Sequence, residues 1–433
     1  MTTSAHSARI VRRTGFGATA TELHAVDGKS PGQVAELVLS RLGGTGRQTT
    51  TTPVPAFQPV DRPPRNASRE AKGMRRMQLR AQLQELTAWW VREMIATDRP
   101  AQEKLTLGWH DHFATAATKV RSAALLLAQN RTLREKGLGD FHALAYAMLI
   151  DPAMLVWLDG RRNTRQAPNE NLSREFMELF ALGHGNYTET DVREGARALT
   201  GWKVDPDGTA AIRDATHDHG AKTVLGVTGD LDAAAFCDAV LARPASARFV
   251  ATRLWHRLAS PASPAPALLE RLVRAYGPGR DLRALLGALL EAPEFGAAAG
   301  TLVISPVEWL VGAVRALDVP VDTDQALLPL LRVLRSLGQV PFYPPSVAGW
   351  PSGQAWLSTA SVNTRLMAAR SLAAAADLSA IAALSQGSRV EAVAHRLGIP
   401  TLTDRTANVL ADAATSPTRL VTLALNTPEY LTH

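Results

Sequence analysis

The chain has 433 residues, of which 46% are hydrophobic and 20% are charged. This composition excludes an intrinsically disordered chain, and the length is sufficient for a large buried core. Lys and Arg together number 47 against 40 Asp and Glu, and the net charge of +7 is a modest excess that requires no anionic partner.

Segments rich in Ala, Leu and Arg alternate with loops rich in Gly and Pro along the chain. Because these three residues lose little conformational freedom in a helix, the pattern predicts an all-α fold, a large multi-helix bundle with little or no sheet. Residues 1–68 are expected to hold a pair of helices and a linker. Residues 69–433 are expected to form the main helical body, which carries the candidate site.

The expected helices follow one another in chain order. The first pair lies within 5–43 and is followed by a linker over 43–68. Residues 203–230 break the helical pattern and are expected to form a loop or short hairpin, and 338–357 hold too many Pro and Gly for regular structure. Helical periodicity recurs over 69–98, 101–116, 122–135, 139–150, 170–182, 188–200, 231–243, 245–258, 265–276, 280–291, 306–317 and 325–337, with more helices after Val362.

The first half of the helix over 69–98 is strongly basic. A solvated helix surface accounts for this pattern, because no aromatic residue interleaves the basic ones to stack on a base. A nucleic-acid partner is therefore not expected, although an anion-binding or nucleic-acid-binding module stays open as a third interpretation. The basic residues are Arg69, Lys72, Arg75, Arg76 and Arg80.

The termini and the single cysteine bear on location. No apolar run follows Arg12 and Arg13, as a secretory signal would require, and no window approaches the roughly 18 apolar residues of a membrane helix. A cytoplasmic protein with no membrane contact is therefore expected. Cys237 is the only cysteine and lies in an apolar helical pattern, so it is expected in the core.

The segment over 168–202 concentrates charge within an apolar stretch. Charged side chains are kept out of cores unless they are paired or bound. Arg174 and Glu178 are four residues apart and can pair on a helix, and Glu175 and Glu178 can converge on one cation. Together with Glu170, these residues form the first candidate site; a solvated helix face with one ion pair is the alternative.

Two further groups offer metal ligands. His110 and His112 cannot both bind one metal from a regular helix, but they could do so if the helix ends there or if the segment is extended. His112 points inward, where it binds a metal or holds a backbone carbonyl. The second group lies in irregular chain, which often carries binding residues, and its adjacent His and Asp suit a divalent metal. It consists of His217, Asp218, His219, Gly220 and Lys222. A polar loop capped by its own side chains is the alternative.

Several blocks resemble the bacterial domain-of-unknown-function family 1800, a family without a settled activity. The resemblance runs in order over nearly the whole chain, and it implies family membership and candidate residues rather than a reaction. Asp111 and His184 depart from the family pattern, which has Asn and a small or aliphatic residue there. The matching blocks are RRTGFGAT at 12–19, EKLTLGWHDHFAT at 103–115, DPAML at 151–155, NENLSREFMELFALG at 169–183, YTETDV at 187–192, ARALTGW at 196–202, HDHGAKTVLG at 217–226 and PFYPPSVAGWPSGQAW at 341–356.

The blocks at 103–115, 169–183 and 217–226 lead to one main hypothesis. His112, Glu170, Glu175, Glu178 and His217 are expected to share a polar pocket, with His110 and Asp218 as further metal ligands. Such mixed His and carboxylate sets suit Fe, Mn or Zn. The expected protein is a metal-dependent enzyme acting on an unknown small molecule by oxidation or hydrolysis.

The candidate catalytic residues of this enzyme are Arg174, Glu175 and Lys222. The competing hypothesis is a non-catalytic helical scaffold, in which Arg174, Glu175 and Glu178 form a buried ion-pair network. In a further block, Trp350 and Trp356 lie on a loop rich in Pro and Gly. They floor a pocket or pack the loop rigidly on the body.

Overall fold

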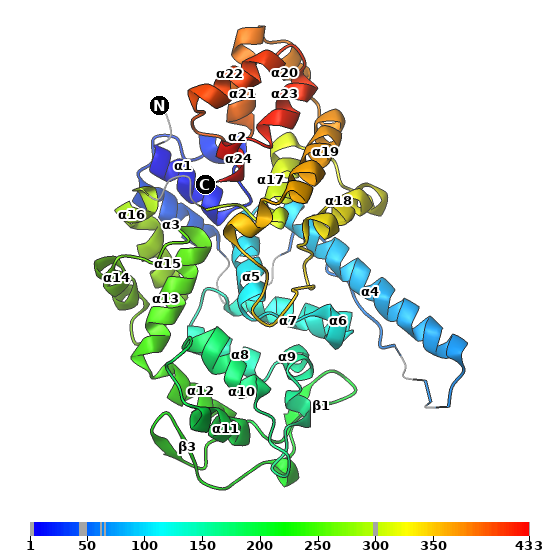
Figure 1. The fold of residues 1–433 in the computed structure, drawn as a ribbon, viewed down its shortest axis with the longest axis vertical. Helices are drawn as coiled ribbons and strands as arrows, with labels where there is room; N and C mark the ends of the chain where they lie inside the picture. Colours follow the sequence, from blue (N-terminus) through cyan, green and yellow to red (C-terminus); the bar gives the residue numbers. More distant parts are fainter. Residues whose placement is uncertain (1–3, 43–49, 61–62, 65, 298–301, 433) are drawn as a thin grey trace.

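A computed structural model describes residues 4–42, 50–60, 63–64, 66–297 and 302–432. Over these residues the chain forms 24 α-helices and two short antiparallel strand pairs (Figure 1). The prediction of a helical fold with little sheet is confirmed. Among the described residues, no helix has both the length and the hydropathy needed to span a bilayer.

The N-terminal segment forms three helices where a pair was expected. The additional helix, α2, has five residues and begins at a capping box in which Thr19 and Glu22 satisfy each other's backbone N–H groups. The start of α3 at Ser30 and Pro31 agrees with the sequence prediction. These helices pack on α5, α15 and α16. Their bounds are α1 Ala5–Thr14, α2 Ala20–His24 and α3 Pro31–Arg41.

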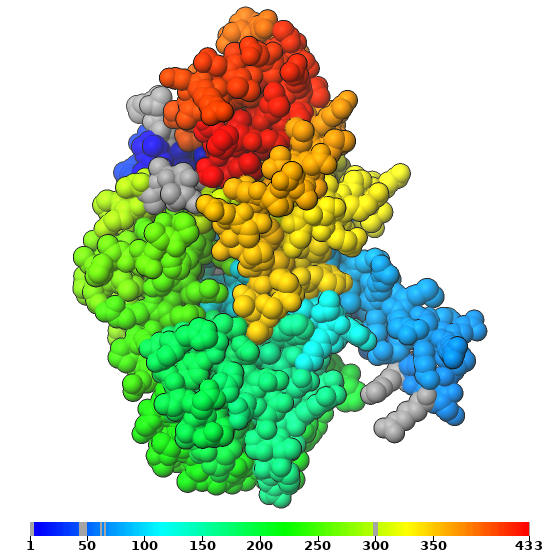
Figure 2. All heavy atoms as spheres, in the orientation of Figure 1, coloured from blue at the N-terminus to red at the C-terminus, as the bar shows by residue number. Residues whose placement is uncertain are grey.

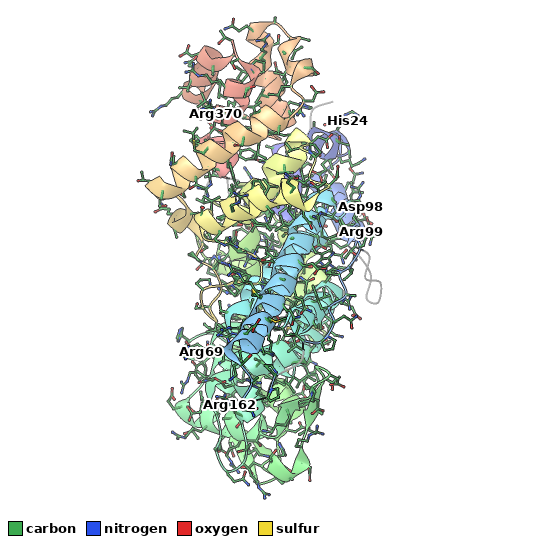
Figure 3. The ribbon with its side chains drawn as sticks, turned by 90° about the vertical axis from the view of Figure 1, so that its right-hand side faces the viewer. His24, Arg69, Asp98, Arg99, Arg162 and Arg370 are labelled. Carbon is green, nitrogen blue, oxygen red and sulfur yellow. The ribbon has the colours of Figure 1, made fainter. Side chains whose placement is uncertain are left out.

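The long helix α4, Arg69–Ala96, projects from one side of the molecule (Figure 2). In Figure 3 it runs between Arg69 at one end and Asp98, just beyond its other end. Part of the predicted linker lies along it, since the carboxylate of Glu93 accepts from the backbone N–H groups of Thr51 and Thr52 at 2.9 and 2.7 Å. Residues 43–49, 61–62 and 65 of that linker lie outside the described residues.

The helices in the middle of the molecule contribute side chains to two hydrophobic cores. Leu105 and Trp109 of α5 face the larger core, and Leu107 of the same helix faces the smaller one. The larger core also takes side chains from α8 and from α10 to α15. The helices of this middle layer are α5 Pro100–His112, α6 Ala117–Val120, α7 Ala123–Lys136, α8 Phe141–Leu149 and α9 Pro152–Trp157.

The lower end in Figure 1 combines short helices with both hairpins. Helix α11 begins at the predicted capping box of Thr188 and Asp191. Strands pair as β1–β2 and β3–β4, so the alternative of a short hairpin within 203–230 is confirmed. The elements are α10 Asn171–Glu175, the π-helix η2 Phe176–Ala181, α11 Glu189–Ala198, β1 Trp202–Val204, β2 Ala210–Ile212, β3 Lys222–Val224, β4 Val227–Gly229 and α12 Ala233–Leu241, with 3₁₀ turns η1 Gly160–Arg162 and η3 Asp214–Thr216.

The remaining helices build the side and the upper end of the molecule. The smaller core lies mainly between α4, α17, α18, α19, α21 and α23. Cys237 of α12 is buried in the larger core, as predicted, and burial raises the pKa of its thiol to about 12. The helices are α13 Pro244–Leu258, α14 Pro266–Tyr276, α15 Leu282–Glu291, α16 Pro293–Ala297, α17 Pro306–Leu317, α18 Asp324–Leu337, α19 Thr359–Ala375, α20 Ser379–Ala382, α21 Gln386–Arg396, α22 Asp404–Ala413, α23 Pro417–Ala424 and α24 Pro428–Leu431, with the 3₁₀ turn η4 Gly353–Trp356.

Candidate functional site

The carboxylate helix is not a regular helix over 170–182. After α10 it widens into the π-helix η2, and the N–H of Leu182 donates to the carbonyl of Met177, five residues back, at 2.8 Å. A π turn takes more residues than an α turn, so side chains four apart no longer lie above one another. The predicted pairing of Arg174 with Glu178 was therefore wrong.

The charges of this segment divide into two separate groups on its surface. Arg174 contacts Glu170 at 3.0 Å and Glu189 at 2.7 Å, and its side chain is 32% exposed. Glu178 accepts from the hydroxyl of Tyr187 and lies 3.0 Å from Nε2 of His184. The buried network proposed for the scaffold hypothesis is thus not formed around Arg174.

Glu175 lies between these two groups without joining either. It is partly buried, and no hydrogen bond or ion pair to its carboxylate is found among the described residues. Burial, and next the charge of Glu178, raise the pKa of Glu175 above its usual range. A carboxyl group with a raised pKa accepts a proton readily, and a bound cation would restore its charge. In the part of the chain that the structure describes, however, the one histidine found in contact with Glu175 or Glu178 is the exposed His184.

The two histidines of α5 lie in different surroundings. Nε2 of His110 accepts from the backbone N–H of Phe342 at 3.1 Å, and burial lowers the pKa of His110 to about 3. Nε2 of His112 donates to the carbonyl of Phe180 at 2.9 Å, near the C-terminal end of the π-helix. That carbonyl belongs to a helix end whose acceptors lack internal partners, so His112 acts as a cap.

Each histidine therefore has a structural contact, and the two face different elements. Burial also lowers the pKa of His112 well below its usual range. Burial thus favours the neutral form of both imidazoles, and Nδ1 of His112 makes no hydrogen bond to the described residues. His112 thus makes the contact with a backbone carbonyl that the sequence predicted as the alternative to metal binding.

Three ligand atoms from the loop and hairpin after β2 converge at the lower end of the molecule. One atom each from His217, His219 and Asp230 lies within 4.8 Å of the other two. Among the described residues, no other group of three or more His, Cys, Asp and Glu side chains meets this geometry. His217 is buried, whereas the side chains of His219 and Asp230 are about half exposed, at 53% and 51%.

Hydrogen bonds fix which nitrogen of each histidine is available. Nδ1 of His217 donates to the carbonyl of Thr200 at 2.9 Å, which leaves the lone pair on Nε2. Nε2 of His219 contacts Asp214 at 2.9 Å, and its Nδ1 lies 3.4 Å from Asp230. Metal-binding histidines commonly donate their second N–H to a carbonyl or carboxylate in this way.

Asp218 and Lys222 lie beside this group. Asp218 does not face the ligand atoms, because its carboxylate pairs with Arg197 of α11 at 2.7 Å. Lys222 is fully buried, and its Nζ donates to Asp230 at 2.6 Å. Lys222 is thus the one predicted catalytic residue adjacent to the three ligands.

The structure does not gather the predicted residues into one pocket. His112 lies in the middle layer, Glu170, Glu175 and Glu178 lie along α10 and η2, and His217 lies against the carbonyl of Thr200. Sequence reasoning missed Asp230, which follows β4. Lys222 pairs with Gly229 in the β3–β4 hairpin, and this pairing brings the next residue, Asp230, close to the loop of His217 and His219.

Fold and site together define a mostly helical protein with a solvent-open cluster of two histidines and a carboxylate. The chain belongs to the family DUF1800, described as a protein of unknown function, whose pattern matches residues 9–432. No curated protein and no solved structure shows a significant match to this chain. His219 stands at the position that the histidine-aspartate-x-glycine-x-lysine block leaves open, so the family pattern did not single it out.

Proposed function

We propose that this protein is a metal-dependent enzyme that binds a divalent transition metal through His217, His219 and Asp230. The observation that carries the proposal is the convergence of three ligand atoms within 4.8 Å, with both imidazoles oriented by a second hydrogen bond. Orientation before binding lowers the ordering cost of the ligands. This proposal transfers the metal from the expected pocket to the hairpin loop.

The ligand set indicates which metals suit the site. Two imidazoles and one carboxylate match Fe, Mn or Zn better than Ca, which prefers six to eight oxygen atoms. Three protein ligands leave coordination positions for water and for a substrate. Because His219 and Asp230 are half exposed, a small molecule can reach those positions from solvent.

The identity of the metal would decide the reaction. Zn has no redox chemistry and would activate water for hydrolysis, whereas Fe or Mn would also support oxidation. In either reaction the neighbouring ammonium of Lys222 supplies positive charge beside the ligand Asp230. Because the Lys222 side chain is fully buried, this charge would act on a substrate through Asp230 and the metal rather than by direct contact.

Elemental analysis of the purified protein tests the proposal first. We expect Zn, Mn or Fe in the wild type, and a rise in the melting temperature of a few degrees when that metal is added to chelated protein. His219→Ala should abolish both effects without unfolding the protein, because the His219 side chain is 53% exposed.

His142→Ala is the matched control. His142 contacts Asp238 at 2.6 Å, and the described residues place no third ligand with this pair, so its loss should leave metal content unchanged. A wild type that purifies without metal and gains no thermal stability from Zn, Mn or Fe would refute the proposal. Equal loss of metal in both variants would point to adventitious binding at surface histidines.

The scaffold hypothesis keeps one observation in its favour. Arg134 and Glu103 form a bidentate ion pair in which both side chains are almost fully buried, at 1% and 2% exposure. The indole N–H of Trp90 donates to the same carboxylate at 2.8 Å. A buried Arg–Glu network therefore exists, between α5 and α7, and it would serve a scaffold by fixing helix packing.

A further inference from the structure

A cavity of about 160 Å³ lies between α5 and α13 in the middle of the molecule. The loop that carries Trp350 and Trp356 lines it on another side, together with apolar side chains such as Leu254. An engineered protein cavity of roughly 150 Å³ takes up benzene, so this space suits a molecule of about one ring. It is separate from the three ligands of the hairpin loop.

The charged residues that line this cavity do not balance. Lys104 pairs with Glu308 at 2.9 Å, and Arg257 pairs with Asp111. Arg253 lines the same cavity but has no carboxylate partner among the described residues. The cavity therefore carries one positive charge in excess.

Arg253 is available to a ligand. Its recorded contact is with the ring of Phe249, at 5.9 Å from the guanidinium carbon to the ring centre, and it makes no described hydrogen bond. The residue is exposed at the edge of the cavity; partial desolvation of its guanidinium, and then the like charge of Arg257, lower the pKa of Arg253, and the charge of Asp111 opposes this shift. An anion between Arg253 and Arg257 would relieve that repulsion.

Trp350 is a largely buried member of the cavity lining. The residue is 7% exposed, and its Nε1 is buried with no hydrogen-bond partner in the described part of the chain. Its backbone N–H donates to Asp111 at 2.7 Å, which fixes the residue against α5. Because Nε1 has almost no accessible surface, it does not face the open cavity, and Trp350 contributes ring surface to the lining rather than a donor.

We propose that this cavity binds a small organic monocarboxylate with an apolar body of about one ring. The carboxylate neutralises the single excess charge, and a guanidinium binds it through two parallel hydrogen bonds. The apolar body contacts Trp350, Trp356 and Leu254. A phosphate dianion fits less well, because its second charge would be uncompensated beside Asp111 and Glu308.

Calorimetric titration of the full chain with benzoate tests this inference, with benzamide as the uncharged analogue. We expect benzoate to bind and benzamide to bind at least about tenfold more weakly. Arg253→Gln should weaken benzoate binding by roughly 10- to 100-fold, the usual effect of losing hydrogen bonds to a charged group.

Two further variants make the result specific. Arg248→Gln on the same helix is the control, because Arg248 pairs with Glu270 and does not line the cavity, so affinity should not change. Asp111→Asn keeps an acceptor for the N–H of Trp350 but frees Arg257, so benzoate affinity should rise several-fold.

Three outcomes would overturn the inference. The first is equal binding of benzamide and benzoate, and the second is unchanged binding in Arg253→Gln. The third is that acetate, hexanoate and benzoate all fail to bind at ~10 mM, a ligand concentration well above the dissociation constant expected of a specific complex. Preferential binding of inorganic phosphate over benzoate would contradict the assignment to carboxylates.

Discussion

Lys222 and Asp230 form an ion pair beside the β3–β4 hairpin, with Nζ 2.6 Å from Oδ1 and the Lys222 side chain fully buried. The hydrogen bond from this ammonium holds the pKa of Asp230 below its usual range. A divalent cation bound by His217 and His219 would share the same carboxylate with the ammonium. Lys222 therefore has two opposite effects. Its hydrogen bond keeps Asp230 ionised, but its positive charge repels a metal cation bound to the same carboxylate.

Replacing Lys222 by Met should therefore strengthen metal binding. Methionine keeps the buried apolar stem and removes the charge, and we expect roughly a tenfold gain in Zn affinity by calorimetric titration. Lys203→Met in β1 is the control, because Lys203 donates to the carbonyl of Arg161 and should have no effect. Weaker Zn binding in Lys222→Met would mean that Lys222 positions Asp230 more than it competes.

The two arginine networks should differ in their contribution to stability. Glu103→Gln leaves Arg134 buried without a charged partner and should lower the free energy of unfolding by ~3–5 kcal/mol. Arg174→Gln disrupts a network whose members are 32% to 66% exposed, so its effect should be about 1 kcal/mol or less. Urea denaturation measures both, and equal losses would contradict this ranking.

Asp151 should make stability depend on pH. It caps α9 by accepting from the N–H of Met154 at 2.8 Å, and burial, opposed by that hydrogen bond and one from Gln129, raises its pKa from 3.8 to about 7. A raised folded-state pKa gives a stabilisation that is complete below pH ~4 and is lost as the pH rises to ~7. The loss is on the order of 4 kcal/mol.

Asp151→Asn removes this titration while keeping a good helix cap. Relative to the wild type, the variant should gain stability steadily between pH 4 and 7 and hold a constant advantage above that range. Urea denaturation at several pH values measures the difference. A difference that does not change with pH would show that the Asp151 carboxyl does not titrate in this window.

The loop of Trp350 depends on a glycine that closely approaches α5. Gly349 has φ +85°, and a Cβ there would overlap the carboxylate and carbonyl of Asp111. Gly353 has φ +63° but open space around it. Gly353→Ala should therefore lower stability only by the backbone strain of ~1–2 kcal/mol, and Gly349→Ala by roughly 1–3 kcal/mol more. Equal losses in thermal melts would refute this account of the approach to Asp111.

The sequence predicted those features that depend on local signals. The capping residues at Ser30 and Thr188 mark helix starts that the structure has, because a cap acts within one turn. The π-helix after Glu175 had no such signal. It changed the partners of Arg174 and Glu178, since pairing on a helix depends on the number of residues per turn.

The metal ligands were harder to predict because they are not all close in sequence. His217 was identified from its own loop, but Asp230 reaches it only through the register of β3 and β4. Periodicity within one segment carries no information about such pairing between segments. The cavity between α5 and α13 was out of reach for the same reason, although Trp350 and Trp356 had been considered as the floor of a pocket.

The single buried thiol makes opening of the larger core measurable by thiol labelling. Cys237 is buried in the larger core, and burial raises its pKa to about 12, so we expect a thiol reagent to react very slowly with the folded form at neutral pH. Each labelling event therefore counts one opening of that core, with no background from a second cysteine. When labelling is faster than reclosing, the labelling half-life measures the rate of core opening, and when it is slower, the half-life measures the population of the open form.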